Sequence, residues 1–116
     1  ISCGVMVSES MKAAEYLSSK GIEATVVDMH TLKPLDTDLI DELVGRCKGL
    51  VTAEDHSVIG GLGSAVAEHV SYNGGTPLRM VGVPDRFGES GTPQDLMEAM
   101  GITYGDIATS CESLMS

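Results

Sequence analysis

Short apolar runs alternate along the chain with longer segments in which apolar residues recur at helical spacing. The first three residues resemble the end of a strand, and further strands are expected at 24–29 (ATVVDM), 49–54 (GLVTAE) and 77–83 (PLRMVGV). The 24–29 run does not alternate between apolar and polar residues, as expected for a strand covered on both faces. The apolar pattern therefore predicts several buried strands separated by helices.

Local start and stop signals predict where the intervening helices begin and end. Ser8 and Asp36 are expected N-caps, and Gly21 is expected just past the end of the first helix. Thr92 and Thr103 are expected to start two later helices. The predicted helices cover about 8–20, a segment following 36, about 64–72, a segment between 92 and 101, and a segment following 103.

Strands that alternate with helices predict an α/β fold with a mostly parallel sheet between two helical layers. In such sheets, ligands bind where the strands end at their carboxyl edge. The segments at 30–35, 54–63 and 84–92 are therefore the first places to look for a functional site.

Composition narrows the classes of partner. The 116 residues form one domain, and 7 basic against 17 acidic residues leave a net charge of −10. This charge repels phosphate backbones and anionic lipids, which argues against nucleic-acid or membrane binding. No basic and apolar leader is recognisable, and the widely spaced Cys3, Cys47 and Cys111 suggest reduced thiols, so a cytoplasmic location is expected.

The glycine-rich stretch HSVIGGLGSAVAEHV (56–70) raises the question of phosphate binding. Gly61 and Gly63 fit the first two glycines of a dinucleotide fingerprint, but Val66 stands at the third. No Lys-Ser/Thr pair follows, which excludes a P-loop. The favoured interpretation is structural: the glycines permit a tight turn and a close helix–sheet approach.

Two other segments carry candidate chemistry. Glu54, Asp55 and His56 cluster at the carboxyl end of a predicted strand, and they are interpreted either as a hydrogen-bonded loop or as an interface or ligand contact. His56 with Asp55 and Ser57 contains parts of a hydrolase triad, but neighbours in sequence do not provide triad geometry. His30, His56 and His69 are too scattered to predict a metal site.

The second segment is VPDRFGESGTP (83–93). Arg86 and Glu89 could form a local ion pair, and Arg86 together with the helix start at Thr92 could bind an anion. A purely structural loop is the other interpretation.

Three motifs in register resemble the C-terminal domain of the transketolase family. They are DMHTLKPLD (28–36), VTAEDHSVIGGLGSAVAEHV (51–70) and GVPDRFGESGTPQDLMEAMGIT (82–103). The last is most similar to transketolase itself, particularly the form split into N- and C-terminal polypeptides. The element HSVIGGLGSAV (56–66) also resembles deoxyxylulose-phosphate synthase, and the β subunits of 2-oxo acid dehydrogenases are more distant.

The resemblance implies a three-layer α/β/α sandwich with a mostly parallel five-stranded sheet and one antiparallel strand. It implies that thiamine diphosphate and Mg²⁺ bind to other domains of a dimeric enzyme that transfers ketol units between sugar phosphates. No catalytic, cofactor or metal residue is then expected here, and the domain would serve architecture and dimer contact. Residues 1–116 would be the C-terminal part of a longer chain, with its first strand truncated.

Two alternatives remain open at this point. One keeps the fold and assigns the domain to deoxyxylulose-phosphate synthase or to a 2-oxo acid dehydrogenase β subunit. The other is a free-standing regulatory module that binds a small anion through Arg86 and the helix start at Thr92.

Overall fold

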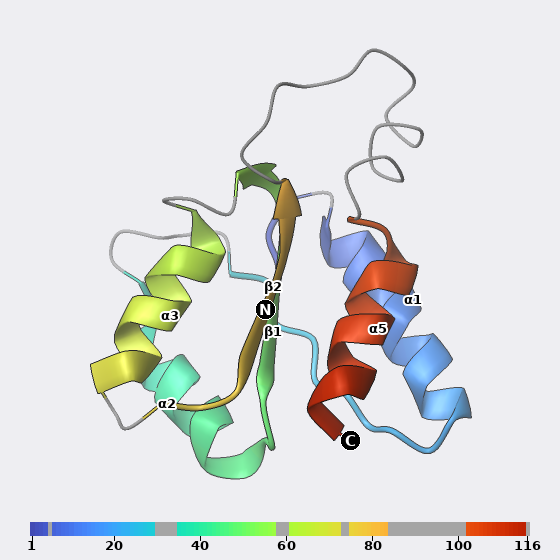
Figure 1. Ribbon diagram of the computed structural model, residues 1–116, viewed down its shortest axis with the longest axis horizontal. Coiled ribbons are helices and arrows are strands. Elements are labelled where there is room, and N and C mark those ends of the chain that lie inside the picture. Colours follow the sequence, from blue (N-terminus) through green and yellow to red (C-terminus); the bar gives the residue numbers. More distant parts are fainter. Residues whose placement is uncertain (5, 30–34, 58–60, 73–74, 84–101, 116) are drawn as a thin grey trace.

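A computed structural model describes residues 1–4, 6–29, 35–57, 61–72, 75–83 and 102–115 of the chain, with the backbone alone for 55–57 and 83. Two helices come first in the chain, and strands and helices alternate after them (Figure 1). In chain order they are α1 (Met6–Ser19), α2 (Thr37–Arg46), β1 (Leu50–Ser57), α3 (Leu62–Tyr72), β2 (Leu78–Val83) and α5 (Tyr104–Met115).

The strands pair in parallel. β1 and β2 lie side by side with Leu50 opposite Leu78. Ser2 forms parallel bridges to Asp28 on one side and to Ala53 of β1 on the other. The first residues of the chain therefore lie between the segment that contains Asp28 and β1. The expected strand at 24–29 is present among the described residues as this single bridge at Asp28.

The helices cover the two faces of this sheet. α2 and α3 lie on one side of β1 and β2, and α1 and α5 lie on the other (Figure 1). Each side has its own buried apolar cluster. The cluster on the side of α1 and α5 consists of Met6, Ala13, Leu17, Ala53, Val81, Ile102, Ile107 and Ala108. The cluster on the side of α2 and α3 consists of Met29, Ile40, Leu43, Leu50, Leu62, Val66 and Val70. The predicted α/β fold with parallel strand pairing is confirmed.

Several predicted helix ends are confirmed because local hydrogen bonds determine them. The Asp36 carboxylate accepts a hydrogen bond from the Leu39 backbone N–H at 3.1 Å, which caps α2. Gly21 has φ of +81° directly after α1, the left-handed conformation that glycine adopts readily. The Thr103 N–H donates to the Asp106 carboxylate at 2.8 Å at the start of α5.

Two predicted helix starts are wrong. α1 begins at Met6 and not at Ser8, because Gly4, with φ of +60°, turns the chain sharply after the first strand residues. α3 begins at Leu62 and not at Ser64, because a distant carboxylate caps it, as described below. The helix expected after Thr92 lies outside the described residues.

Candidate functional site

The carboxyl ends of β1 and β2 lie at the edge where an α/β sheet is expected to bind ligands. α1, α3 and α5 all begin at this edge, so three helix N-termini point toward it (Figure 1). Each helix N-terminus has unpaired N–H groups and a partial positive charge. What satisfies these N–H groups decides whether the edge can hold an anion.

At α3 the partner is a carboxylate of the chain itself. Glu54, on β1, is only 1% exposed. Its Oε1 accepts a hydrogen bond from the Leu62 N–H at 2.8 Å, and its Oε2 accepts one from the Gly63 N–H at 2.7 Å. Such charge-assisted bonds are among the strongest in proteins. Glu54 therefore occupies the position at the start of α3 that a phosphate takes in a nucleotide-binding loop.

The glycine-rich turn also allows α3 to lie close to the sheet. A Cβ on Gly63 would lie 2.6 Å from the Met80 sulfur and 2.9 Å from the Thr52 hydroxyl oxygen. Real Cβ atoms do not approach other atoms so closely, so only glycine fits without a shift of β1, β2 or α3. The structural interpretation is confirmed for Gly63, which lets α3 lie close to the sheet.

At α5 the N–H groups are also satisfied by carboxylates. Glu9, on α1, is 6% exposed, and its Oε2 accepts a hydrogen bond from the Tyr104 N–H at 3.1 Å. The Asp106 Oδ2 accepts from both the N–H and the hydroxyl of Thr103 at 2.8 Å. Lys12 Nζ lies 3.8 Å from the other oxygen of Glu9. Glu9 therefore links the start of α5 to α1. The carboxylates of Glu9 and Asp106 already accept from the N–H groups that an anion would need there.

The remaining site residues expected from the sequence fall largely outside the described part. The backbone of Asp55 and His56 continues β1, which runs to Ser57, but their side chains are not described. Arg86, Glu89 and Thr92 lie outside the described residues. Of the six predicted contact residues, Glu54 is therefore the one whose side chain the structure describes.

His69 and the cysteines have identifiable surroundings. His69 Nε2 lies 2.8 Å from Asp41 Oδ1 and joins α3 to α2 at the surface. Cys3, Cys47 and Cys111 are half-buried and form no disulfide. Burial raises the pKa of the Cys111 thiol, which favours the protonated form at neutral pH. Among the described residues, no three His, Cys, Asp or Glu side chains gather as a metal ion would require.

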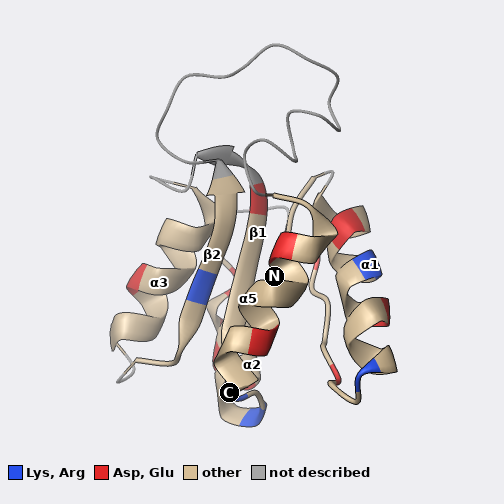
Figure 2. Cartoon of the chain, turned by 45° about the vertical axis from the view of Figure 1, so that its right-hand side comes forward, with Lys and Arg blue, Asp and Glu red and all other residues tan. Residues whose placement is uncertain are grey.

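The described surface is predominantly acidic. Aspartate and glutamate occur on all four described helices, whereas α3 and α5 contain no lysine or arginine (Figure 2). This distribution agrees with the charge argument against nucleic acid. None of the helices in the described ranges has the length and apolar character needed to cross a membrane.

The sequence reasoning missed Glu9. It lies in the buried stripe of α1 with Met6, Ala13 and Leu17. The sequence did contain a signal for this contact, because Glu9 stands at a position where the helical pattern places apolar residues. An ionised group buried at such a position needs a partner.

The chain matches known proteins along nearly its whole length. The family model described as "Transketolase, C-terminal domain" matches residues 1–107. The 6-deoxy-6-sulfo-D-fructose transketolase subunit SqwH of Clostridium sp. (strain MSTE9) is 46% identical over 107 residues, which are 92% of this chain and 33% of that protein. The 1-deoxy-D-xylulose-5-phosphate synthase of Chlorobium luteolum is 45% identical over 106 residues, covering 90% of this chain and 17% of that protein.

A solved structure shows the same fold. It is entitled "Split gene transketolase, inactive beta4 tetramer" and superposes with a TM-score of 0.94 at 46% identity, over 98% of this chain and 37% of that one. The chain thus spans a third or less of the two curated relatives. The fold, the family model and the relatives agree, and the chain belongs to the transketolase C-terminal domain family.

Proposed function

We propose that the chain is the C-terminal domain of a thiamine-diphosphate-dependent transketolase. In this proposal the domain belongs to a longer protein or subunit that assembles as a dimer in the cytoplasm. It contributes architecture and contacts, while the other domains hold the cofactor and transfer a ketol unit between sugar phosphates. We also propose that the complete sheet has five strands, one of them antiparallel, between two helical layers.

The observation that carries this proposal is the likeness to a split-gene transketolase over 98% of the chain at 46% identity. The match to the SqwH subunit, which is also a transketolase, points the same way. The chain covers about a third of each of these proteins. This coverage supports the proposal that other domains bind the cofactor and transfer the ketol unit.

The geometry of the carboxyl edge supports a non-catalytic role. A diphosphate with Mg²⁺ needs free N–H groups and clustered oxygen ligands. The Glu54 carboxylate already occupies the start of α3, and the Glu9 carboxylate that of α5. The starts of α3 and α5 therefore do not fit the diphosphate of thiamine diphosphate, and no step of the reaction is assigned to them.

Activity and binding measurements test the proposal. The whole protein, with thiamine diphosphate and Mg²⁺, is expected to transfer a ketol unit from xylulose 5-phosphate to ribose 5-phosphate. The 116-residue chain alone is expected to show no transfer and no calorimetric binding of thiamine diphosphate. Tight binding of the cofactor by the isolated chain would contradict a non-catalytic role.

A second candidate is the same domain in a deoxyxylulose-phosphate synthase. It is favoured by the 45% identity to the Chlorobium luteolum synthase. Formation of 1-deoxy-D-xylulose 5-phosphate by the whole protein, without transfer to ribose 5-phosphate, would select this candidate.

The contact surface of the domain is proposed to include Glu54, Asp55, His56, Arg86, Glu89 and Thr92. Arg86→Ala is expected to weaken assembly of the whole protein, as measured by analytical ultracentrifugation. A stabilisation of the isolated chain by phosphate or sulfate that Arg86→Ala abolishes would instead assign this arginine to an anion site.

A further inference from the structure

Met80 is an exposed methionine on β2 that packs against the start of α3. Its sulfur would lie 2.6 Å from a Cβ on Gly63, although the residue as a whole is 46% exposed. Gly63 is one of the two residues whose N–H groups the Glu54 carboxylate caps. The Met80 side chain therefore lies between the solvent and the capped first turn of α3.

Thr52 is the neighbour of Met80 on β1. The two residues are opposite each other in the parallel register, so their side chains lie on the same face of the sheet, which α3 covers. The Thr52 hydroxyl oxygen would lie 2.9 Å from the same Cβ position on Gly63. The Met80 sulfur and the Thr52 hydroxyl are therefore close neighbours beneath the start of α3.

The Thr52 hydroxyl is buried without a hydrogen-bond partner in the part of the chain that the structure describes. A buried polar group without a partner costs free energy, so each one needs an explanation. A thioether sulfur accepts hydrogen bonds only weakly. Reduced Met80 therefore leaves the hydroxyl unsatisfied, whereas an oxygen bound to the same sulfur would be a strong acceptor.

We propose that Met80 is a site of reversible oxidation by hydroperoxides, and that the Thr52 hydroxyl binds the oxygen of the resulting sulfoxide. The sulfur loses two electrons: an S–O bond forms and the O–O bond of the hydroperoxide breaks. The proton of the transferred oxygen moves to the departing oxygen, which leaves as water or an alcohol. Methionine sulfoxide is polar, and reductases convert it back to methionine. The flexible, unbranched side chain lets the new oxygen turn toward Thr52.

Other exposed methionines provide matched controls. Met115 has the same exposed fraction as Met80, and Met11 is also exposed. They lie on α5 and α1, which cover the other face of the sheet, so they are not neighbours of the Thr52 hydroxyl (Figure 1). Oxidation of these two residues therefore shows what exposure alone produces.

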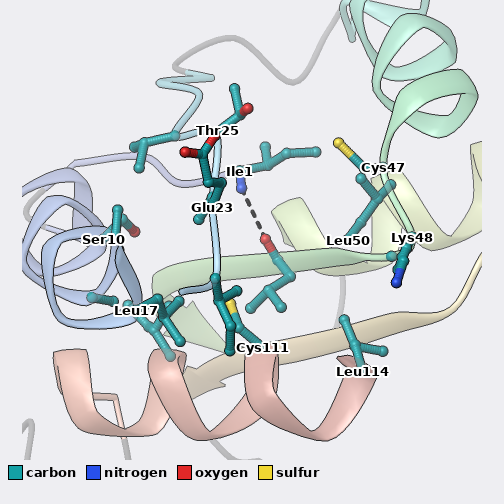
Figure 3. A pocket seen from close by; sticks show the side chains of 18 of the residues that line it. Ile1, Ser10, Leu17, Glu23, Thr25, Cys47, Lys48, Leu50, Cys111 and Leu114 are labelled. Atoms are coloured by element: carbon teal, nitrogen blue, oxygen red, sulfur yellow. Dashed lines mark hydrogen bonds between the residues drawn. The ribbon is translucent and has the colours of Figure 1, made fainter. Parts of the chain in front are cut away.

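Thiols also react with hydroperoxides, so the experiment has to separate them from Met80. Cys47 and Cys111 line one pocket (Figure 3), and both are half-buried, as is Cys3. Treatment with dithiothreitol after the peroxide restores thiols from sulfenic acids and disulfides, and it leaves methionine sulfoxide in place. Any change that survives this treatment belongs to the methionines.

The test compares the unchanged chain with Thr52→Val, Thr52→Ser and Met80→Leu, before and after hydrogen peroxide. Valine keeps the size of Thr52 and removes the hydroxyl, and serine keeps the hydroxyl. Met80→Leu measures the part of any change that belongs to other methionines. Peptide mass spectrometry measures oxidation at Met80 and Met115. The readouts are Tm and amide hydrogen exchange at Leu62 and Gly63, and exchange is also followed in the whole protein.

The effect of Thr52→Val is expected to change sign on oxidation. In the reduced chain it is expected to raise Tm by about 3 °C, because the unsatisfied hydroxyl is removed. In the oxidised chain it is expected to lower Tm by about 5 °C, because the sulfoxide loses its donor. Exchange at Leu62 and Gly63 is then expected to be at least roughly threefold faster than in the oxidised unchanged chain. Thr52→Ser is expected to match the unchanged chain after oxidation.

Equal effects of peroxide on Thr52→Val and on the unchanged chain, after subtraction of the Met80→Leu result, would overturn the proposal. So would full oxidation of Met115 while Met80 stays reduced. A reduced valine variant that is less stable than the unchanged chain, or unfolded, would show that the hydroxyl already has a partner, and it would also overturn the proposal. If the 116-residue chain is unfolded, exchange in the whole protein gives the same comparison. None of these measurements involves ketol transfer.

Discussion

The cap that Glu54 places on α3 makes a quantitative prediction. Substitution Glu54→Gln keeps the size and shape of the side chain, but it removes the charge and turns one acceptor oxygen into an NH₂ group. One of the two N–H groups, that of Leu62 or Gly63, then loses its acceptor in a site that is 1% exposed.

The magnitude follows from the two bonds. A hydrogen bond to a charged group contributes about 1.5–3 kcal/mol, and a buried N–H left without an acceptor costs about 1–3 kcal/mol. Loss of the negative charge at the helix N-terminus removes a further 0.5–1 kcal/mol or so. Against this, the variant no longer has to bury an ionised group. We expect a net loss of about 2.5 kcal/mol in the free energy of unfolding.

Urea unfolding followed by far-ultraviolet circular dichroism measures this loss. With an m value of about 1.5 kcal/mol/M, the midpoint is expected to fall by roughly 1.5 M. Glu68→Gln is the matched control, since Glu68 is an exposed glutamate on α3, the helix that Glu54 caps, and its effect is expected to stay within about 0.5 kcal/mol. Hydrogen exchange of the Leu62 and Gly63 amides is expected to accelerate in Glu54→Gln. A variant as stable as the control would refute the capping argument.

Three further predictions concern neighbouring features. Gly63→Ala is expected to cost about 1–3 kcal/mol in the same unfolding assay, because its Cβ meets Met80 and Thr52; an unchanged midpoint would show that the contact relaxes freely. Glu9→Gln is expected to cost about 1 kcal/mol and to speed exchange of the Tyr104 amide, and unchanged exchange there would argue against the cap on α5. In the 116-residue chain, burial lowers the pKa of the Ile1 ammonium in the folded state below its ordinary value of 8.0. At pH values between the folded-state pKa and 8.0, the unfolded state therefore binds more protons than the folded state. Stability is therefore expected to rise with pH up to about 8, and N-terminal acetylation is expected to abolish that rise; a rise that persists after acetylation would assign it to another group.

Some elements could be predicted from sequence because their causes are local. Asp36 caps α2 through a bond to a residue three positions away, and Gly21 ends α1 through its own conformation. The starts of α1 and α3 were missed because their causes lie elsewhere. Gly4 turns the chain next to Ser2, which is paired with the distant residues Asp28 and Ala53, and Glu54 caps α3 from eight positions upstream.

The sequence by itself determined the fold class and the family. Apolar periodicity and helix signals are short-range, and three motifs in register are specific, so neither required coordinates. Only the tertiary structure decided what the glycine-rich stretch does. The same glycines suit a phosphate or a buried carboxylate, and the answer depends on Glu54 lying at the start of α3.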